Sequence, residues 1–310
     1  MHPDIATVAH ELLARFRRQR PLRGGSLIIT LFGDSILPRG GTIALSSLIR
    51  LAAPFGLNER LVRTATTRLA HDGWVDARRD GRLSEYQLSK SGRERFADAT
   101  QRVYGGPTAP WGGRWTLIVL PAMRAADRQR MRKELAWQGF GEISGNVFAH
   151  PEYQPHDVVP HLFTTPLPHD VLIFDADLTD DLAPEALVRL GWDLADLGKR
   201  YQRFAQRFER ALNALDAPRP RSIDPDSAYI VRTLLIHEYR KLHLRDPLLP
   251  QRLLPPRWPG TRARELCREI YLRVVAPSEH YLSTAAANLN GPLPPPDGTL
   301  MQRFGGLGGD

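Results

Sequence analysis

The residues best suited to chemistry lie in a predicted helix at residues 58–72, NERLVRTATTRLAHD. Helical periodicity places Val62, Ala65, Thr66 and Leu69 on its inner stripe, with Asn58 as a candidate N-cap. The other side carries cationic and hydroxyl side chains: Arg60, Arg63, Thr64, Thr67 and His71. Because arginine pairs with guanine or phosphate and threonine contacts phosphate or a thymine methyl group, this face predicts DNA recognition. A solvated surface charge is the alternative for each arginine taken singly.

A basic hairpin follows this helix. Residues 74–79 and 82–88 alternate apolar and polar side chains around Asp80-Gly81, a strong hairpin pattern, and the tip carries Arg78, Arg79 and Arg82. Apolar spacing predicts two earlier helices, at residues 26–32 and 45–52. This order of elements is that of a winged helix-turn-helix, which binds DNA or, as the alternative, serves only as a scaffold for protein contacts.

Charge is unequally distributed along the 310 residues. Residues 1–110 hold 17 Lys and Arg against 10 Asp and Glu, a net charge of +7, whereas residues 111–310 hold 25 against 24. Clustered cations gain free energy by releasing counterions from a phosphate backbone. The N-terminal part therefore favours an anionic partner, with a solvated basic face as the alternative.

The common catalytic motifs are missing from the sequence. His237-Glu238 does not begin a zincin motif, because Lys241 stands four residues after His237. The residues Asp175, Asp177, Asp180 and Asp181 could hold a cation, but acidic residues between a strand and a helix more often form a solvated loop. We expect no enzymatic activity, no metal and no cofactor, with a metal-dependent nuclease as the alternative.

Length and composition narrow the class of protein further. A chain of 310 residues predicts two or three domains. The longest apolar run, residues 26–32, is too short to span a bilayer, and no apolar stretch of signal-peptide type occupies the first 20 residues. Cys267 is the single cysteine, so no intramolecular disulfide is possible. We expect a cytoplasmic protein with no membrane partner.

Two segments resemble one bacterial family. Residues 31–41 (LFGDSILPRGG) and 47–82 (SLIRLAAPFGLNERLVRTATTRLAHDGWVDARRDGR) are similar to the N-terminal region of the PaaX repressors of phenylacetic acid degradation, and residues 237–260 (HEYRKLHLRDPLLPQRLLPPRWPG) are similar to their C-terminal segment. The resemblance implies a homodimeric repressor with a GntR-like winged helix, released from its double-stranded DNA operator by phenylacetyl-CoA. By position it assigns Arg60, Arg63, Thr64, Thr67 and Arg68 to the recognition helix, and Arg78, Arg79 and Arg82 to the wing.

The central part of the chain alternates predicted strands and helices. Strands at residues 115–121, 146–151 and 171–178, a helix at 125–140 and a helical stretch at 184–215 predict a ferredoxin-like α/β sandwich. The family resemblance implies a Cas2-like middle domain, which agrees. Cas2-type nucleases end their first strand with a metal-binding aspartate, whereas residues 120–123 (LPAM) contain no carboxylate.

The predicted fold class is α+β and multidomain, with a winged helix-turn-helix, a ferredoxin-like (Cas2-like) centre and a mainly helical C-terminal domain. The predicted parts are an N-terminal extension at 1–23, the winged helix at 24–104, a linker at 105–113, the central domain at 114–216, the C-terminal domain at 222–282 and a disordered tail at 283–310. The tail prediction rests on the Pro- and Gly-rich composition after Asn290.

An aryl-CoA effector needs cations for its phosphates and an apolar pocket for its aryl group. Such residue types gather in the second family-like segment: His237, Tyr239, Arg240, Arg245, Arg257 and Trp258. The alternative is structural, with Trp258 packed between domains and Arg245 capping the helix that Asp246-Pro247 ends.

Overall fold

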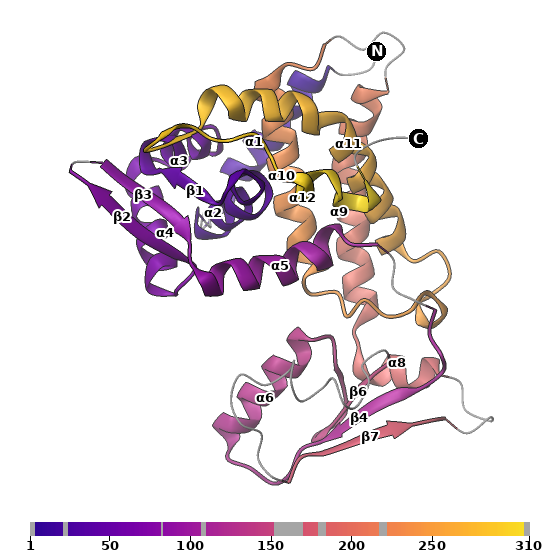
Figure 1. Ribbon diagram of the computed structural model, residues 1–310. Coiled ribbons are helices and arrows are strands. Elements are labelled where there is room, and N and C mark those ends of the chain that lie inside the picture. The colour runs from indigo at the N-terminus through magenta and orange to yellow at the C-terminus, as the bar shows by residue number, and fades with distance from the viewer. Residues whose placement is uncertain are drawn as a thin grey trace. The chain divides into compact units, whose positions relative to one another are not determined.

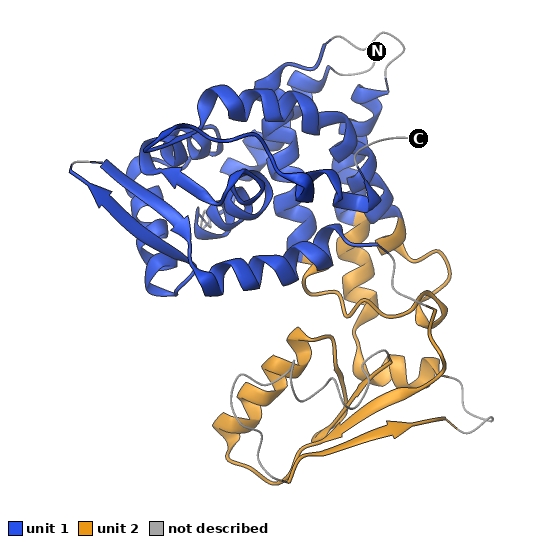
Figure 2. Ribbon diagram, viewed as in Figure 1, with its two compact units in different colours: residues 1–106, 203–241, 262–310 blue, residues 107–202, 242–261 orange. Residues whose placement is uncertain are grey.

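The computed structural model describes residues 4–20, 24–81, 83–106, 110–151, 170–178, 184–216 and 222–306. The chain forms two compact units, each assembled from separate stretches (Figure 2). The first contains residues 1–106, 203–241 and 262–310, and the second contains residues 107–202 and 242–261.

The N-terminal part of the first unit combines helices with a small antiparallel sheet (Figure 1). Its elements are α1 (Ile5–Arg17), α2 (Gly24–Leu31), a π-helical turn (Phe32–Ile36), a 3-10 turn (Leu37–Arg39), β1 (Thr42–Ala44), α3 (Leu45–Ala52), a 3-10 turn (Ala53–Phe55), α4 (Glu59–His71), β2 (Val75–Asp80), β3 (Leu83–Leu88) and α5 (Lys90–Tyr104). The strand order is β1-β3-β2. The helices predicted at residues 26–32, 45–52 and 58–72 and the hairpin after them are confirmed.

Long C-terminal helices complete the core of this unit. They are α9 (Leu194–Leu215), which begins in the second unit, α10 (Pro225–His243) and α11 (Pro259–Ala285). Tyr229 of α10 stacks on Tyr281 of α11 with ring centroids 4.6 Å apart, and its hydroxyl donates to the Leu51 carbonyl oxygen at 2.9 Å. The helices therefore pack against the N-terminal elements as part of one core.

The predicted disorder of the C-terminal tail is wrong for residues 283–306. This segment forms β8 (Ala287–Asn288), β9 (Gly291–Pro292), α12 (Gly298–Met301) and a 3-10 turn (Arg303–Gly305). Leu293, Leu300 and Phe304 are buried in the first unit. A few well-spaced apolar anchors are sufficient to fix a segment whose average composition is polar and Pro-rich.

The second unit is built on a four-stranded antiparallel sheet of order β5-β6-β4-β7 (Figure 1). The strands are β4 (Trp115–Val119), β5 (Gly141–Ser144), β6 (Val147–His150) and β7 (Leu172–Ala176), accompanied by α6 (Ala125–Trp137) and α8 (Glu185–Gly191). Met131 and Leu135 of α6 pack on one sheet face against Ile118 and Phe148. Strand β5 was absent from the prediction, because GEIS is too short and too polar to stand out.

The predicted continuous helix at residues 184–215 is also wrong, because the chain breaks between α8 and α9. Trp192 takes an extended conformation there. Its indole N–H donates to the Gly139 carbonyl oxygen at 2.9 Å, and its ring packs near Trp115. The helix break thus coincides with a partly buried Trp192 that packs against the core of the second unit.

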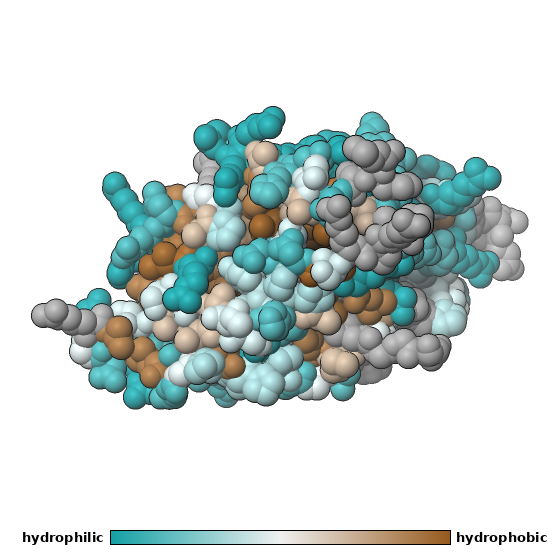
Figure 3. All heavy atoms as spheres, turned by 90° about the horizontal axis from the view of Figure 1, so that it is seen from above, coloured by the Kyte–Doolittle hydropathy of each residue, from teal (hydrophilic) through white to brown (hydrophobic). Residues whose placement is uncertain are grey.

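The surface mixes hydrophilic and hydrophobic side chains. Figure 3 shows hydrophobic residues in separate patches between hydrophilic ones on the face that it draws. The exposed large apolar residues come from several elements: Leu61, Leu83, Trp137, Leu172, Phe174, Leu190 and Met301. Among the described residues, no helix is both long and apolar enough to cross a membrane.

Candidate nucleic-acid interface

Helix α4 is fixed by an N-terminal cap and a buried stripe. The Asn58 side chain accepts a hydrogen bond from the Leu61 backbone N–H at 2.9 Å, which satisfies a donor without an intrahelical partner. The inner stripe is buried as predicted: Val62, Ala65, Thr66 and Leu69. Burial of Val62 and Leu69 contributes about 1.5–3 kcal/mol each. The opposite face of α4 is therefore held outward.

This outer face exposes every residue of this segment that was predicted to contact DNA: Asn58 at the cap, Arg60, Arg63, Thr64, Thr67, Arg68 and His71. Arg63 pairs with Glu59 at 2.7 Å, but the two side chains are 56% and 60% exposed. Because exposed pairs contribute only ~0.2–1 kcal/mol, an incoming phosphate or guanine can replace the carboxylate. Thr64 and Thr67 donate their hydroxyls to carbonyl oxygens four residues earlier, so they offer chiefly their methyl groups.

The hairpin beside α4 carries the other predicted arginines. Arg78 and Arg79 are exposed on β2, opposite Glu85 and Ser84 of β3. Gly81 has φ +56 at the turn, a left-handed conformation that glycine adopts at little cost. Arg82 lies outside the described residues.

The base of the hairpin is tied together by one serine. Ser89 donates its hydroxyl to the Gly73 carbonyl oxygen at 2.6 Å and accepts from the Gly92 backbone N–H at 2.9 Å. It thus links the start of the hairpin to the first turn of α5. Trp74 and Phe96 add an edge-to-face contact with ring centroids 5.5 Å apart. These contacts hold the end of the hairpin and the start of α5 against Gly73 and Trp74, the short turn that joins α4 to the hairpin.

A buried ionic network joins the turns after α2 and the end of α5 to the C-terminal helices. Its centre is Asp34, 2% exposed, in the π-helical turn after α2. The Asp34 carboxylate accepts hydrogen bonds from Arg232 at 2.7 Å, Arg303 at 2.8 Å, Tyr104 at 2.7 Å and Tyr271 at 3.0 Å. Arg232 also pairs with Glu279, which in turn pairs with Arg39. The network therefore crosslinks α2, α5, α10, α11 and the tail.

The electrostatics of the network keep Asp34 ionised. Burial alone would raise the pKa of this carboxyl, but Arg232, Arg303 and the two tyrosine hydroxyls together lower it below the usual value. Burial raises the pKa of Tyr271 to about 12, so this hydroxyl stays protonated and can donate to Asp34.

Sequence patterns alone assign no role to the residues of this network. Asp34 and Arg39 belong to the family-like segment 31–41, whereas Arg232 and Arg303 lie outside every predicted site. One indication was available: Asp34 follows the apolar stretch LIITLF, where an uncompensated charge would be costly.

The six predicted effector residues are divided between the two units. In the first unit, His237 is buried and its Nδ1 lies 2.9 Å from the Thr30 hydroxyl. Arg240 donates to the Thr30 hydroxyl at 2.8 Å and to the Ser26 carbonyl oxygen at 2.6 Å. Tyr239 is buried against Phe204. His237 and Arg240 therefore connect α10 to α2, the helix that packs on α4.

Burial governs the charge of these two α10 residues. It lowers the pKa of His237 well below the usual value, with Lys241 and Arg240 acting in the same direction, so the imidazole is neutral at pH 7. Burial also lowers the pKa of Arg240 to about 10. Both side chains are arranged for hydrogen bonding between α10 and α2.

The other three predicted effector residues lie in the second unit. Arg245 and Arg257 are exposed, and Trp258 is buried against Tyr201 with ring centroids 6.0 Å apart. The Tyr201 hydroxyl donates to Asp246 at 2.7 Å at the end of α10. Trp258 thus has a packing role inside its own unit, whereas the structural alternative placed it between domains.

The acidic residues considered for a metal have other partners where they are described. Asp175 and Asp177 pair with Arg114 at 2.7 and 3.2 Å. Asp180 and Asp181 lie outside the described residues. In the described part of the chain, no group of three or more His, Cys, Asp or Glu side chains could hold a metal ion.

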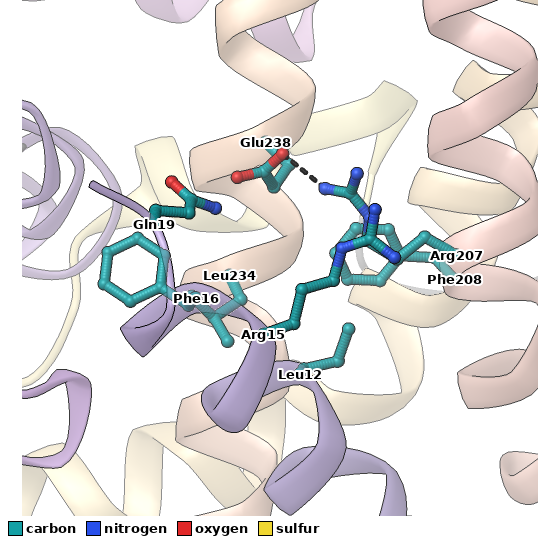
Figure 4. Close-up of a pocket in the computed structure, with 8 residues that line it drawn as sticks. All are labelled: Leu12, Arg15, Phe16, Gln19, Arg207, Phe208, Leu234 and Glu238. Carbon is teal, nitrogen blue, oxygen red and sulfur yellow. Dashed lines mark hydrogen bonds and ion pairs between the residues drawn. The ribbon is translucent and has the colours of Figure 1, made fainter. Parts of the chain in front are cut away.

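A shallow pocket lies between α1, α9 and α10 in the first unit (Figure 4). Its floor is apolar, with Leu12, Phe16, Phe208 and Leu234, and its rim is polar, with Arg15, Gln19, Arg207 and Glu238. Arg207 pairs with Glu238 at 2.6 Å across the rim. The pocket has no room for an aryl-CoA in this conformation.

Known proteins match the chain along most of its length. Three family profiles cover it in order: PaaX-like protein at residues 23–92, PaaX protein central Cas2-like domain at 108–188 and PaaX-like protein C-terminal domain at 192–284. The transcriptional repressor PaaX of Escherichia coli (strain K12) is 38% identical over 290 residues, covering 93% of this chain and 92% of the relative. The chain belongs to the PaaX family.

A solved structure of an uncharacterized protein from Mycobacterium tuberculosis is 25% identical, with a TM-score of 0.45, and the match covers 75% of this chain and 90% of that one. In this PaaX-family protein, α4 and the hairpin fall within the first profile and α9 to α11 within the third, apart from the last residue of α11. The protein is a mixed α/β, multidomain member of the family. The three profiles and the two compact units divide the chain differently, so the predicted domain boundaries stay a prediction.

Proposed function

We propose that this protein is a transcriptional repressor that binds double-stranded operator DNA through α4 and the hairpin β2–β3. The outer face of α4 carries the proposal, because Arg60, Arg63 and Arg68 are exposed there while the opposite face is buried. A relative of 38% identity is the transcriptional repressor PaaX of Escherichia coli.

In this proposal the N-terminal elements are a winged helix-turn-helix. The order α2, β1, α3, α4, β2, β3 and the sheet order β1-β3-β2 support it. Helix α4 would lie in the major groove, and Arg78, Arg79 and Arg82 of the hairpin would contact phosphates or the adjacent minor groove. For the central domain, the sheet order β5-β6-β4-β7 supports a ferredoxin-like arrangement.

A DNA-binding titration on the promoter region of the protein's own gene tests the proposal. Arg63→Ala is expected to weaken operator binding by about 1–3 kcal/mol and to change sequence preference if Arg63 contacts a base edge. Arg79→Ala is expected to weaken binding to all sequences alike and to lower the salt dependence.

Arg200→Ala is the matched control for Arg63→Ala. Arg200 forms the same kind of i,i+4 pair, with Asp196 at 2.7 Å and both side chains more than 40% exposed, but it lies on α9. It should bind the operator like wild type. Equal binding by the wild type, Arg63→Ala and Arg79→Ala, with unchanged circular dichroism, would remove this face as the DNA interface. Cleavage of labelled promoter DNA in magnesium would instead support a nuclease.

We further propose that the protein acts as a homodimer on an aromatic-acid catabolic operon and has no enzymatic activity. A winged helix covers one half-site, and two-fold operators match two-fold proteins. Light scattering should give about 70 kDa, twice the 34.9 kDa of one chain. A monomer both alone and on DNA would contradict this assembly.

The proposed effector is phenylacetyl-CoA or a related aryl-CoA thioester. The hydrogen bonds from His237 and Arg240 to α2 support a signalling role for α10, because α2 packs on α4. An effector that prefers a different arrangement of α10 would shift the protein away from its DNA-binding form.

Calorimetry with phenylacetyl-CoA on wild type, Arg245→Ala and Trp258→Ala tests the predicted effector residues. Unchanged affinity in both variants would place the pocket elsewhere, and no binding by wild type would mean a different effector.

A further inference from the structure

The C-terminal strap, residues 285–297, runs along the elements that present the basic face in the first unit. Five hydrogen bonds attach it: Arg50 to the Ala285 carbonyl oxygen at 3.4 Å, the Ala287 N–H to Ser47 at 3.0 Å, the Leu289 N–H to Glu85 at 2.9 Å, Arg39 to the Pro294 carbonyl oxygen at 2.8 Å, and the Asp297 N–H to the Pro38 carbonyl oxygen at 2.7 Å. Helix α3, strand β3 and the turn before β1 thus share one connecting segment.

The contact with β3 is the one that reaches the basic hairpin. Glu85 lies in the middle strand, between Ala44 of β1 and Arg78 of β2, and its side chain is only 5% exposed. A buried carboxylate is costly unless a donor satisfies it. The Leu289 N–H supplies such a donor, so the position of the strap and the position of β3 depend on each other.

Strands β1 and β2 both pair with β3. The other contacts of the strap are with α3, β1 and the turn at residues 37–39, so β2 is linked to the strap through β3. Beyond Glu85, where the pairing of β3 with β1 ends, the hairpin consists of two strands, and a two-stranded ribbon is marginally stable and twists easily. The phosphate contacts proposed for Arg79 would require the hairpin to hold a fixed angle to α4.

We propose that the strap is a positioning element of the DNA interface, with Leu289 and Glu85 holding the basic hairpin at the angle that α4 requires. This inference rests on the proposed DNA-binding function. It assigns a role to a segment beyond residue 284, where the third family profile ends.

The test measures operator binding and its salt dependence for three strap variants. Leu289→Pro removes the N–H donor, and Glu85→Leu removes its acceptor. Both should lower the salt slope by about 0.9, the loss expected for one phosphate contact, as Arg79→Ala does. Glu85→Gln retains a side-chain oxygen that can accept from Leu289 and should recover most of the affinity lost in Glu85→Leu.

Coupling separates positioning from a general loss of stability. If the strap acts through the hairpin, adding Arg79→Ala to Leu289→Pro or to Glu85→Leu should cause little further loss of operator affinity. Adding Arg63→Ala should lower the affinity as much as it does in the wild type. Asn288→Ala is the control, because it alters the same turn but leaves the Leu289 N–H in place. Circular dichroism and thermal melting verify folding, and if Leu289→Pro does not fold, Glu85→Leu carries the test.

The possible outcomes are distinct. No operator binding by wild type would refute the proposed function itself. In a second outcome, the wild type binds the operator and Arg79→Ala weakens that binding, but folded Leu289→Pro and Glu85→Leu keep the wild-type salt slope. This result would overturn only the positioning role of the strap. Full additivity with Arg79→Ala would overturn it as well.

Discussion

Replacing Asp34 by asparagine removes the negative charge at the centre of the buried ionic network while preserving side-chain size. The asparagine side-chain oxygen can still accept hydrogen bonds from Tyr104 and Tyr271. The asparagine NH2 group, however, places a donor against the Arg232 Nε, which in the wild type donates to Asp34 at 2.7 Å. Arg303 also loses its charged acceptor, leaving Glu279 as the described acidic partner of Arg232.

The substitution removes the charge from the two hydrogen bonds that Arg232 and Arg303 donate to Asp34, and each such bond contributes about 1.5–3 kcal/mol to stability. Breaking a buried ion pair from one side costs about 3–5 kcal/mol, because the remaining charge stays buried without compensation. We expect Asp34→Asn to lower the free energy of unfolding by ~3–5 kcal/mol. With an m-value of about 3 kcal/mol per molar urea, the midpoint would fall by more than about 1 M.

Urea unfolding followed by far-UV circular dichroism measures this shift. Asp127→Asn is the control: Asp127 pairs with Arg130 at 3.0 Å on the surface, with the side chains 46% and 58% exposed. That variant should change stability by less than about 1 kcal/mol. An Asp34→Asn variant as stable as this control would refute the view that Asp34 compensates the buried arginines.

The same carboxyl predicts a dependence on pH. Because the pKa of Asp34 is lower in the folded protein than in the unfolded chain, its stabilisation is present above about pH 4 and is lost as pH falls towards the folded value. Wild type should therefore lose more stability than Asp34→Asn on acidification below pH 5. Parallel acid-unfolding curves would contradict this.

Three further predictions concern other parts of the first unit. Asn58→Ala removes the cap that accepts from Leu61 and should cost about 1 kcal/mol in urea unfolding, with Asn58→Gly affected less. Gly92→Ala should lower the melting temperature clearly, because a Cβ there would lie 2.1 Å from the Trp74 carbonyl oxygen; a wild-type melting temperature would contradict the tight packing of α5. Burial raises the pKa of the Cys267 thiol, so a thiol reagent at pH 8 should label it only after unfolding, and rapid labelling of native protein would show that the thiol is accessible.

Local patterns were sufficient to predict α4 and the hairpin after it. The stripe of Val62 and Leu69, the cap at Asn58 and the turn at Asp80-Gly81 are each determined by neighbours within a few residues. The exposure of Arg60 and Arg63 follows directly from that stripe. Sequence periodicity identifies such surfaces because one buried face fixes the opposite one.

Long-range contacts could not be predicted in this way. Arginines such as Arg232 and Arg303 are expected at the surface. Their burial becomes possible only through acidic partners far away in the sequence, and Arg303 and Asp34 are separated by 269 residues. The disorder predicted for the C-terminal tail is wrong for the same reason, because Leu293 and Phe304 are isolated apolar residues in a Pro- and Gly-rich stretch. The division of the six predicted effector residues between two units likewise depends on the long-range path of the chain, which leaves the first unit and later returns to it.

The interleaved order of the two units has a consequence for biosynthesis. Asp34 leaves the ribosome early, whereas Arg303, one of its two buried cations, is synthesised 269 residues later. Residues 107–202 and 242–261 form the other unit and must emerge in between. The core of the N-terminal elements can therefore be completed only after distant stretches of the chain have been synthesised. Domains that fold one after another from the N-terminus differ in this respect. A nascent chain interrupted before residue 303 would display the basic face on an unfinished core, so that only chains translated past this point complete the core behind that face.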